Sequence, residues 1–105
     1  MWFIFPQIAG LGHSPMSVRF AITSVDEAKA YLAHPILGAR LRECAQLTLD
    51  VEGKTACEIF GSIDEMKFHS SMTLFARAAP DEDIFQRCID KYFGGSPDPA
   101  TSARL

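Results

Sequence analysis

The stretch that decides the fold runs from Ser62 to Ala78 and reads SIDEMKFHSSMTLFARA. Its opening serine is followed three residues later by Glu65, which is the spacing of a capping box. In this motif the hydroxyl and the carboxylate each accept a hydrogen bond from an amide at the start of the helix. Pro80 ends the pattern because proline cannot continue a helix. The stretch therefore predicts a helix over about residues 63–78.

The flanking sequence carries further signals of the same kind. The spacings from Ser24 to Glu27 and from Thr55 to Glu58 also fit the capping box. The pair His34-Pro35 ends a helix, because proline disfavours helical backbone in the residue before it. Apolar residues recur at helical spacing between these signals. Together they predict helices over about residues 25–33, 36–50 and 56–60, and from the acids at 81–83 to Gly94.

These helices indicate an all-α protein, a single domain over residues 1–105 with four to five helices. Periodicity places a buried stripe on the helix over residues 36–50. Its members are Leu37, Leu41, Cys44, Leu47 and Val51. The turn-rich residues 96–105 are predicted to form an irregular tail. His34 is expected to bond the last carbonyls of the helix that it ends.

Composition and charge exclude several classes of function. The formal net charge is -3 and the 10 basic residues are scattered, which argues against a nucleic-acid surface or a basic membrane anchor. No apolar run approaches the roughly 18 residues that a membrane span needs, so we expect a cytoplasmic protein. Histidines and cysteines lack ligand spacing, so neither a metal nor a cofactor is predicted. Cys44, Cys57 and Cys88 are expected to be buried free thiols.

The first residues, Met1-Trp-Phe-Ile-Phe-Pro-Gln7, resemble the middle of a buried segment. A large apolar side chain loses about 1.5–3 kcal/mol when it is left in water, so these residues need a covering surface. We therefore expect a segment upstream of Met1. Without it, Trp2, Phe3 and Phe5 would form an apolar patch that favours self-association. Residues 3–5 fit a short strand and the end of a helix about equally well.

A first polar group, Gly10-Leu-Gly-His-Ser14, places two glycines and a hydroxyl before an expected helix start. Backbone amides gathered in this way can bind a phosphate or a carboxylate. The glycine spacing fits neither a P-loop nor a dinucleotide fingerprint. A plain turn in which Ser14 caps the next helix therefore has more weight than an anion site.

A second polar group lies on the helix that begins near Ser62. Asp64, Lys67 and Ser71 share one face at spacings i, i+3 and i+7, and that face continues into Leu74. A lysine at such a boundary can bind an anion, with the carboxylate as its orienting partner or as a general acid or base. The alternative is an exposed ion pair worth roughly a few tenths of a kcal/mol, beside hydroxyls that bond back to the helix backbone. Spacing alone favours this alternative.

Five stretches are distinctive as a set. They read MWFIFPQ at 1–7, GLGxS at 10–14, EAxxYLxHPxLGxRL at 27–41, IFGxxDxxKxxSSMTLF at 59–75 and GGxPD at 94–98. Together they resemble the bacterial domain-of-unknown-function family 1810, whose members are mainly helical and are sometimes labelled calpastatin. Relatives of this kind usually carry a further helix in front of the first stretch. The family is similar, more distantly, to the YbiA-like superfamily, one branch of which handles NAD- and ADP-ribose-related compounds and cleaves N-glycosidic bonds.

The resemblance implies binding or N-glycosidic hydrolysis of a nucleotide- or ADP-ribose-related small molecule. Such a reaction needs a carboxylate to activate water, and Asp64 or Glu27 would act as the acid or base. Cations would hold anionic groups, backbone amides a phosphate, and other polar or aromatic groups the base or ribose. In that order these are Lys67 and Arg40; Gly10, Gly12 and Ser14; and Trp2 and Gln7. Ser70 and Ser71 are further candidates for ligand binding.

The alternative function is a non-catalytic protein-interaction module that uses the apolar N-terminal residues as its surface. The two hypotheses differ in geometry. A small-molecule site requires Asp64, Lys67, Arg40 and the amides of residues 10–14 to converge on one concave pocket, whereas an interaction module leaves them dispersed.

Overall fold

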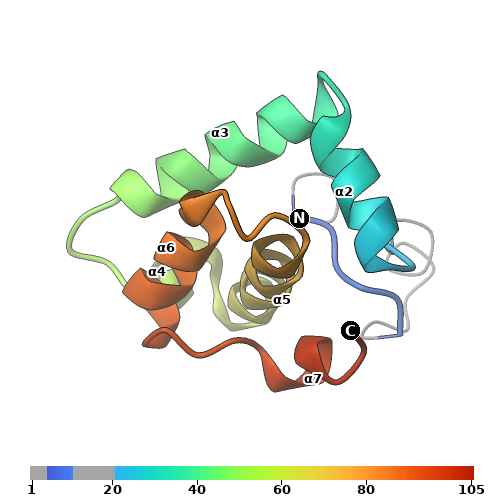
Figure 1. Ribbon diagram of the computed structural model, residues 1–105. Coiled ribbons are helices and arrows are strands. Elements are labelled where there is room, and N and C mark those ends of the chain that lie inside the picture. Colours follow the sequence, from blue (N-terminus) through green and yellow to red (C-terminus); the bar gives the residue numbers. More distant parts are fainter. Residues whose placement is uncertain (1–4, 11–20) are drawn as a thin grey trace.

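A computed structural model describes residues 5–10 and 21–105 of the chain. Within them the helices are α2 (Val25–Ala33), α3 (Leu37–Asp50), α4 (Ala56–Phe60), α5 (Ser62–Ala78), α6 (Asp83–Phe93) and α7 (Pro99–Ser102) (Figure 1). The extended pairing in these residues is a single parallel bridge between Ile8 and Ile22. The all-α prediction is confirmed, and the first five of these helices fall within a residue or two of their predicted bounds.

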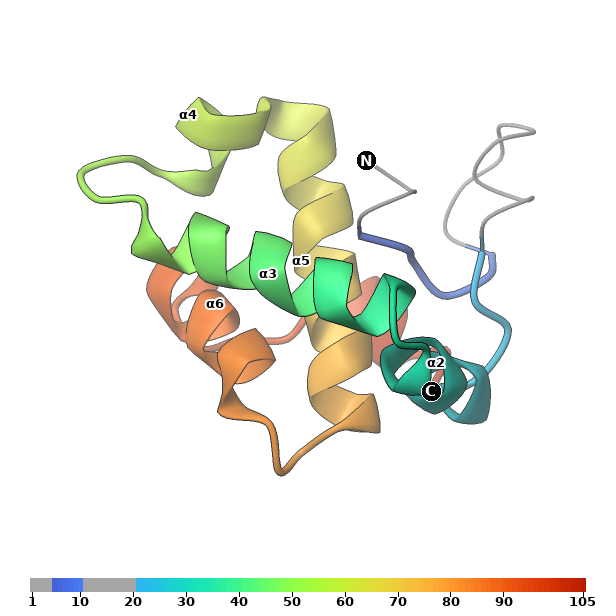
Figure 2. The same ribbon diagram turned by 90° about the horizontal axis from the view of Figure 1, so that it is seen from above.

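Helix α5 is the central element of the fold. It packs against α2, α4, α6 and α7, and Figure 2 shows α4 and α2 near its opposite ends. Its buried residues lie on several faces: Phe68, Ser70, Ser71, Met72, Thr73, Leu74, Phe75 and Ala78. A helix buried on several sides is typical of the interior of a globular domain. The stretch that carries the polar motif is therefore also the main contributor to the core.

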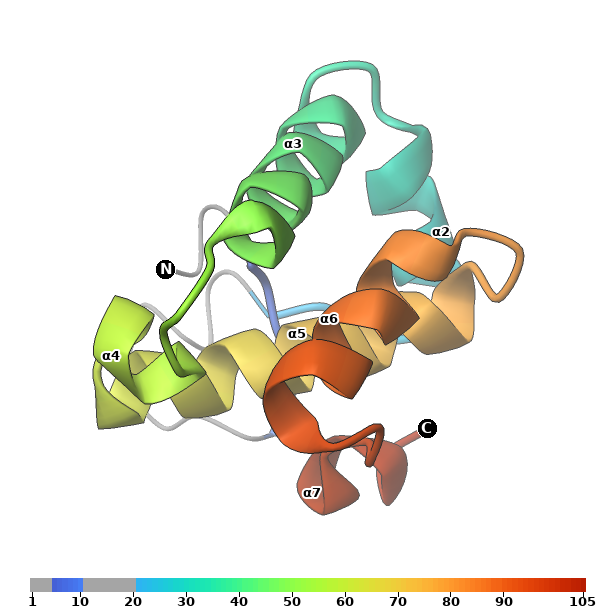
Figure 3. The ribbon, with the colours of Figure 1, turned by 90° about the vertical axis from the view of Figure 1, so that its left-hand side faces the viewer.

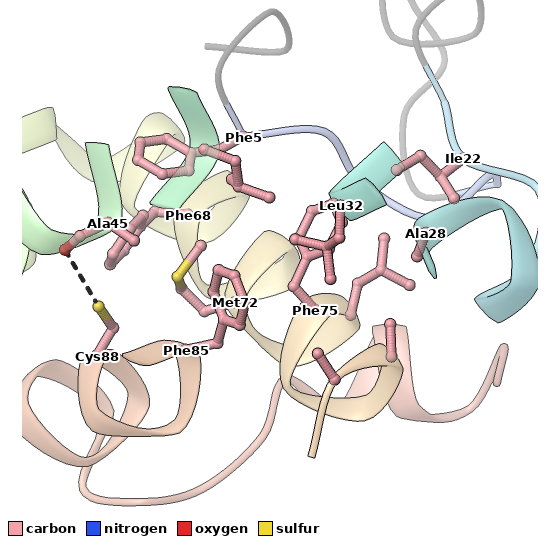
Figure 4. Close-up of a cluster of buried hydrophobic side chains, with 14 of the residues drawn as sticks. Phe5, Ile22, Ala28, Leu32, Ala45, Phe68, Met72, Phe75, Phe85 and Cys88 are labelled. Carbon is pink, nitrogen blue, oxygen red and sulfur yellow. Dashed lines mark hydrogen bonds between the residues drawn. The ribbon is translucent and has the colours of Figure 1, made fainter. Parts of the chain in front are cut away.

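Aromatic rings join the N-terminal segment to this helix. The Phe5 ring lies 5.0 Å from the Phe68 ring and 6.2 Å from the Phe60 ring, both edge to face, measured between ring centroids. Phe5 is almost fully buried, and Figure 4 shows it over Phe68 in the hydrophobic cluster. The expectation that this ring is exposed is wrong, because the chain itself covers it. Trp2 and Phe3 lie outside the described residues.

The buried stripe of α3 differs from the predicted one. The residues that face the core are Gly38, Leu41, Ala45 and Thr48, whereas Leu47 is 60% exposed. Small residues let the neighbouring backbone approach closely, since a Cβ on Gly38 would come within 2.1 Å of the Leu32 carbonyl oxygen. The Thr48 hydroxyl is satisfied by donating to the Cys44 carbonyl at 2.9 Å. Leu41 is buried as predicted and Cys44 packs partly against the core, whereas Leu47 is not buried, because the prediction ranked positions by apolar side chain alone.

His34 has a second role besides the predicted one at the end of α2. Its Nδ1 accepts hydrogen bonds from the amides of Ile36 at 3.2 Å and Leu37 at 3.1 Å. These are among the donors that the first turn of a helix leaves unpaired. The imidazole therefore caps the start of α3, while the His34 amide ends α2 by donating to the Ala30 and Tyr31 carbonyls, as predicted.

The cysteines are unpaired thiols, as predicted, but they are not all buried. Cys88 is buried, Cys44 is half-buried and Cys57 is exposed on the short helix α4. The Cys88 thiol donates to the Ala45 carbonyl at 3.5 Å, and burial raises its pKa to about 12. Cys57 escapes burial because α4 packs chiefly through Ala56 and Phe60.

The last ten residues are not an irregular tail. Asp98 caps α7 by accepting from the Thr101 amide at 3.0 Å, and Pro99 occupies the first turn. This is the usual pattern of a helix start. Periodicity does not predict α7, because a four-residue helix is too short to show it. Figure 3 shows α7 lying below α5 after the turn that follows α6. Thr101 on α7 is fully buried.

Candidate functional site

Lys67 and Asp64 form an ion pair on the first turns of α5. The Lys67 Nζ lies 3.7 Å from Asp64 Oδ1, and the side chains are 19% and 40% exposed, respectively. The spacing that predicted this pair is confirmed. Beside it is a shallow pocket of about 350 Å³, lined by Phe60, Gly61, Ser62, Ile63 and Asp64. The ammonium group therefore lies at the border between solvent and core.

The hydroxyls of the same motif divide into two kinds. Ser70 Oγ donates to the Met66 carbonyl at 3.0 Å, and Thr73 Oγ1 donates to the His69 carbonyl at 2.8 Å. Both follow the predicted alternative of back-bonding to the helix. Ser71 is fully buried, and its Oγ has no hydrogen-bond partner within the described structure. One hydroxyl of the motif is thus left unsatisfied in the interior.

Ser70 and Thr73 have a second task, which is to hold the C-terminal segment. Asp98 Oδ2 accepts from Ser70 Oγ at 3.2 Å and from Thr101 Oγ1 at 2.7 Å. The Asp98 amide in turn donates to Thr73 Oγ1 at 2.9 Å. His69 contributes as well, because its Nε2 lies 2.8 Å from the Ser96 carbonyl oxygen. The structure gives Ser70 a packing role, and the sequence offered no signal of its distant partner.

Glu27 is engaged at the start of α2. Its carboxylate accepts from the Thr23 amide at 3.1 Å and from the Thr23 hydroxyl, while its amide donates to Ser24 Oγ at 3.1 Å. The carboxylate therefore holds the helix cap. Because α2 lies near the opposite end of α5 from α4 (Figure 2), the structure does not bring Glu27 to Asp64.

Arg40 is exposed on α3, and its positive charge lies near the Tyr31 phenol. Burial raises the pKa of the Tyr31 phenol, and the nearby positive charge of Arg40 partly opposes this shift. The Tyr31 ring lies 5.6 Å from that of Phe75, one turn after Ser71 on α5. Tyr31 is a further site candidate. In the sequence it stood out only as part of the stretch 27–41 that resembles the family. An aromatic residue beside Leu32 on a helix otherwise rich in small and charged residues was the available signal.

The glycine-rich stretch begins away from the ion pair on α5, next to Arg104. Gly10 has a φ of 95°, and the Arg104 guanidinium packs on it so closely that a Cβ would lie 2.3 Å from Nη1. Arg104 also lines a pocket of about 300 Å³ with residues 23–26 at the start of α2. Gln7 pairs through its backbone, since its carbonyl accepts from the Ile22 amide at 2.8 Å. Gly12, Ser14 and Trp2 lie outside the described residues.

The predicted site residues are thus only partly gathered, and none of the pockets described is lined by Asp64, Lys67 and Arg40 together. Asp64, Lys67 and Ser71 share one face of α5, whereas Gly10 and Glu27 lie by the start of α2. In residues 5–10 and 21–105 no group of histidine, cysteine and acidic side chains could hold a metal ion. None of the helices described is long and apolar enough to span a membrane.

Fold and site together define an all-α protein with a half-buried ion pair on its central helix. The chain belongs to the family described as "Protein of unknown function (DUF1810)", whose sequence model matches residues 1–105. It is similar to the conserved hypothetical protein Rv1873 from Mycobacterium tuberculosis, known from a crystal structure. The two share 51% sequence identity and a TM-score of 0.97 over 99% of this chain and 74% of that chain. No curated protein matches.

Proposed function

We propose that this protein binds a small anionic molecule of the nucleotide- or ribose-containing class at the α5 face around Lys67. The observation that carries the proposal is the position of Lys67. Its side chain is only 19% exposed, and it lies one turn before the fully buried Ser71. Asp64 already pairs with this charge, and an anionic ligand would be a further partner for the same ammonium group. Asp64, at 3.7 Å, would orient the ammonium group.

The resemblance to the YbiA-like superfamily favours a ligand that contains ribose. Within the proposed site, Asp64 is the carboxylate placed to activate a water for N-glycosidic hydrolysis, because it is partly exposed and borders the pocket next to α4. Glu27 is not proposed as its partner, because it holds the cap of α2. Phe75 follows Lys67 by about 12 Å along the helix. Its ring contacts Tyr31, and Tyr31 lies close enough to Arg40 for the charge to act on the phenol. We therefore propose Arg40 as the cation at the far end of an extended ligand.

Thermal unfolding with a panel of ADP-ribose, NAD and nucleotides tests this proposal. A ligand that binds the native state raises the melting temperature by mass action. Lys67→Met should abolish that rise while leaving the melting temperature without ligand within a couple of degrees, since an ion pair of this exposure contributes roughly 1 kcal/mol or less. Lys29→Met, on the exposed side of α2, is the matched control and should keep the rise. A Lys67→Met variant that unfolds early with or without ligand would indicate a structural role.

A protein-interaction surface is the second candidate, and two exposed apolar residues favour it. Ile63 and Met66 are 70% and 71% exposed, and they are neighbours on the first turns of α5. Replacing both by serine should abolish self-association in sedimentation velocity if this surface forms a homo-oligomer. A protein that sediments as a monomer before and after the change would count against that surface as a self-association site.

A further inference from the structure

A separate pocket lies where α5, α6 and the C-terminal segment around α7 meet. Figure 1 shows α5 nearly end-on, with α6 and α7 on neighbouring sides of it. The pocket measures about 210 Å³, and neither Asp64 nor Lys67 lines it. Its charged lining side chain, Arg77, follows Lys67 by about 15 Å along the helix. The lining residues are Thr73, Ala76, Arg77, Gln86, Ile89, Pro97 and Leu105.

Arg77 is the cation of this pocket, and no acidic side chain pairs with it. In the part of the chain that the structure describes, the ion pairs between side chains use other cations, Arg42 and Lys67. The remaining residues contain no aspartate or glutamate. The Arg77 side chain is exposed and lies in the last turn of α5, where the helix dipole favours a positive charge. Its guanidinium donors are therefore not taken by a carboxylate side chain.

The other polar side chains of the pocket are already engaged. Thr73 Oγ1 donates to the His69 carbonyl and accepts from the Asp98 amide. Gln86 Nε2 donates to Asp90 Oδ1 at 2.9 Å. A ligand in this pocket would therefore meet one cation and a wall of apolar carbon. The apolar lining residues are Ala76, Ile89, Pro97 and Leu105.

This lining favours a small aliphatic monocarboxylate. The planar fork of an arginine donates two parallel hydrogen bonds to a carboxylate. A phosphate monoester carries more negative charge than one guanidinium balances, and its remaining oxygens would face apolar carbon. The volume of about 210 Å³ is below the roughly 300 Å³ at which pockets for drug-sized ligands begin, so the acid must be short.

We propose that this pocket is a second binding site, separate from the face around Lys67, and that it takes a short-chain aliphatic acid. The carboxylate lies on the Arg77 guanidinium, and the alkyl chain lies against Ile89, Pro97 and Leu105. Because the ligand contacts two helices and the C-terminal segment, it joins three parts of the chain. The proposal does not depend on the function proposed for Lys67.

A series of straight-chain acids from acetate to valerate, titrated into the labelled protein and followed by NMR, tests the ligand class. Butyrate should bind in the millimolar range, and butyramide, which has the same size but no charge, about tenfold more weakly or worse. Each added methylene should strengthen binding by up to about fourfold, because it is buried against the apolar wall. No binding of butyrate, or equal affinity for butyrate and butyramide, would overturn the proposal.

Variants then test the place of binding. Arg77→Gln should weaken butyrate binding about tenfold or more. Arg87→Gln, at an exposed arginine of α6 that does not line the pocket, is the matched control and should leave the affinity unchanged. Arg77→Lys keeps the positive charge at the end of α5 but lacks the planar fork, so it should keep the melting temperature and still bind more weakly.

The apolar wall has its own variant. Leu105→Ala shortens the wall, so it should weaken the binding of valerate more than that of acetate. If butyrate binds both Arg77 variants as tightly as the unaltered protein, the carboxylate does not lie on Arg77 and the proposal fails.

Discussion

The two terminal segments described by the structure dock on the same helix by different means. Residues 5–9 reach α5 through an aromatic ring, with Phe5 against Phe68 and Phe60. The C-terminal segment reaches it through polar contacts that centre on Asp98. On the C-terminal side each hydroxyl of α5 has a partner, whereas Ser71 has none. The polar groups that hold the C-terminal segment are therefore satisfied, and Ser71 is the exception on this helix among the residues described.

Breaking the apolar contact should have the largest effect. Phe5→Ala removes a nearly buried ring from the core cluster and should lower the free energy of unfolding by about 3–5 kcal/mol, measured by urea denaturation. Phe5→Leu fills much of the same volume and should lose roughly half of that or less. A loss below about 1 kcal/mol for the alanine variant would show that the segment contributes little to the folded state.

Breaking the polar contact should cost somewhat less. Asp98→Ala removes the cap of α7 and the acceptor for Ser70 and Thr101, so unfolding should become easier by about 2–3 kcal/mol. Asp98→Asn retains one carbonyl oxygen as an acceptor and should recover part of this loss. If alanine and asparagine behave alike, with a loss under about 0.5 kcal/mol, polar docking of the C-terminal segment is dispensable and the contrast between the two segments disappears.

The same contrast explains how far the sequence could be interpreted. Local signals predicted α5 and also the Asp64 and Lys67 pair, which follows from its spacing. The predicted capping box at Ser62 does not form, because the cap position is Gly61, which has no side chain to accept a hydrogen bond. On α3 helical periodicity placed Leu41 correctly but missed Gly38 and Ala45, because close packing selected these small residues over the larger Leu47. Residue size and identity along one helix do not reveal how near its neighbour lies.

The two serines show a different limit. Ser70 and Ser71 are consecutive, so they point about 100° apart around the helix. One meets Asp98, which lies 28 residues further along the chain, and the other points into the interior. Nothing local distinguishes them, because the partner of Ser70 becomes a neighbour only after α6 has folded back on α5. A polar site built from distant segments is for this reason less predictable than an apolar core.

The smallest effect should come from an ion pair that binds neither segment to α5. Arg42 on α3 donates to both carboxylate oxygens of Glu82, at 2.6 and 3.0 Å. This hydrogen bonding, chiefly, lowers the pKa of the Glu82 carboxyl below its usual value. A carboxyl with a lowered folded-state pKa stabilises the fold above its unfolded-state pKa, and the benefit is lost as the pH falls through the folded-state value.

The difference in unfolding free energy between the unaltered protein and Glu82→Gln should therefore depend on pH. Near pH 7 the variant should be less stable by roughly 1 kcal/mol or less, because the side chains of Arg42 and Glu82 are 39% and 32% exposed and water screens the pair. As the pH falls below the usual range of a carboxyl pKa the difference should shrink, since Glu82 takes up a proton. Glu43→Gln, at an exposed acid next to Arg42, is the control and should show a smaller dependence. A difference in stability that grows on acidification would mean that hydrogen bonding to the charged Glu82 carboxylate does not stabilise this contact. The contrast between satisfied and unsatisfied polar groups would then hold only for the two segments that dock on α5.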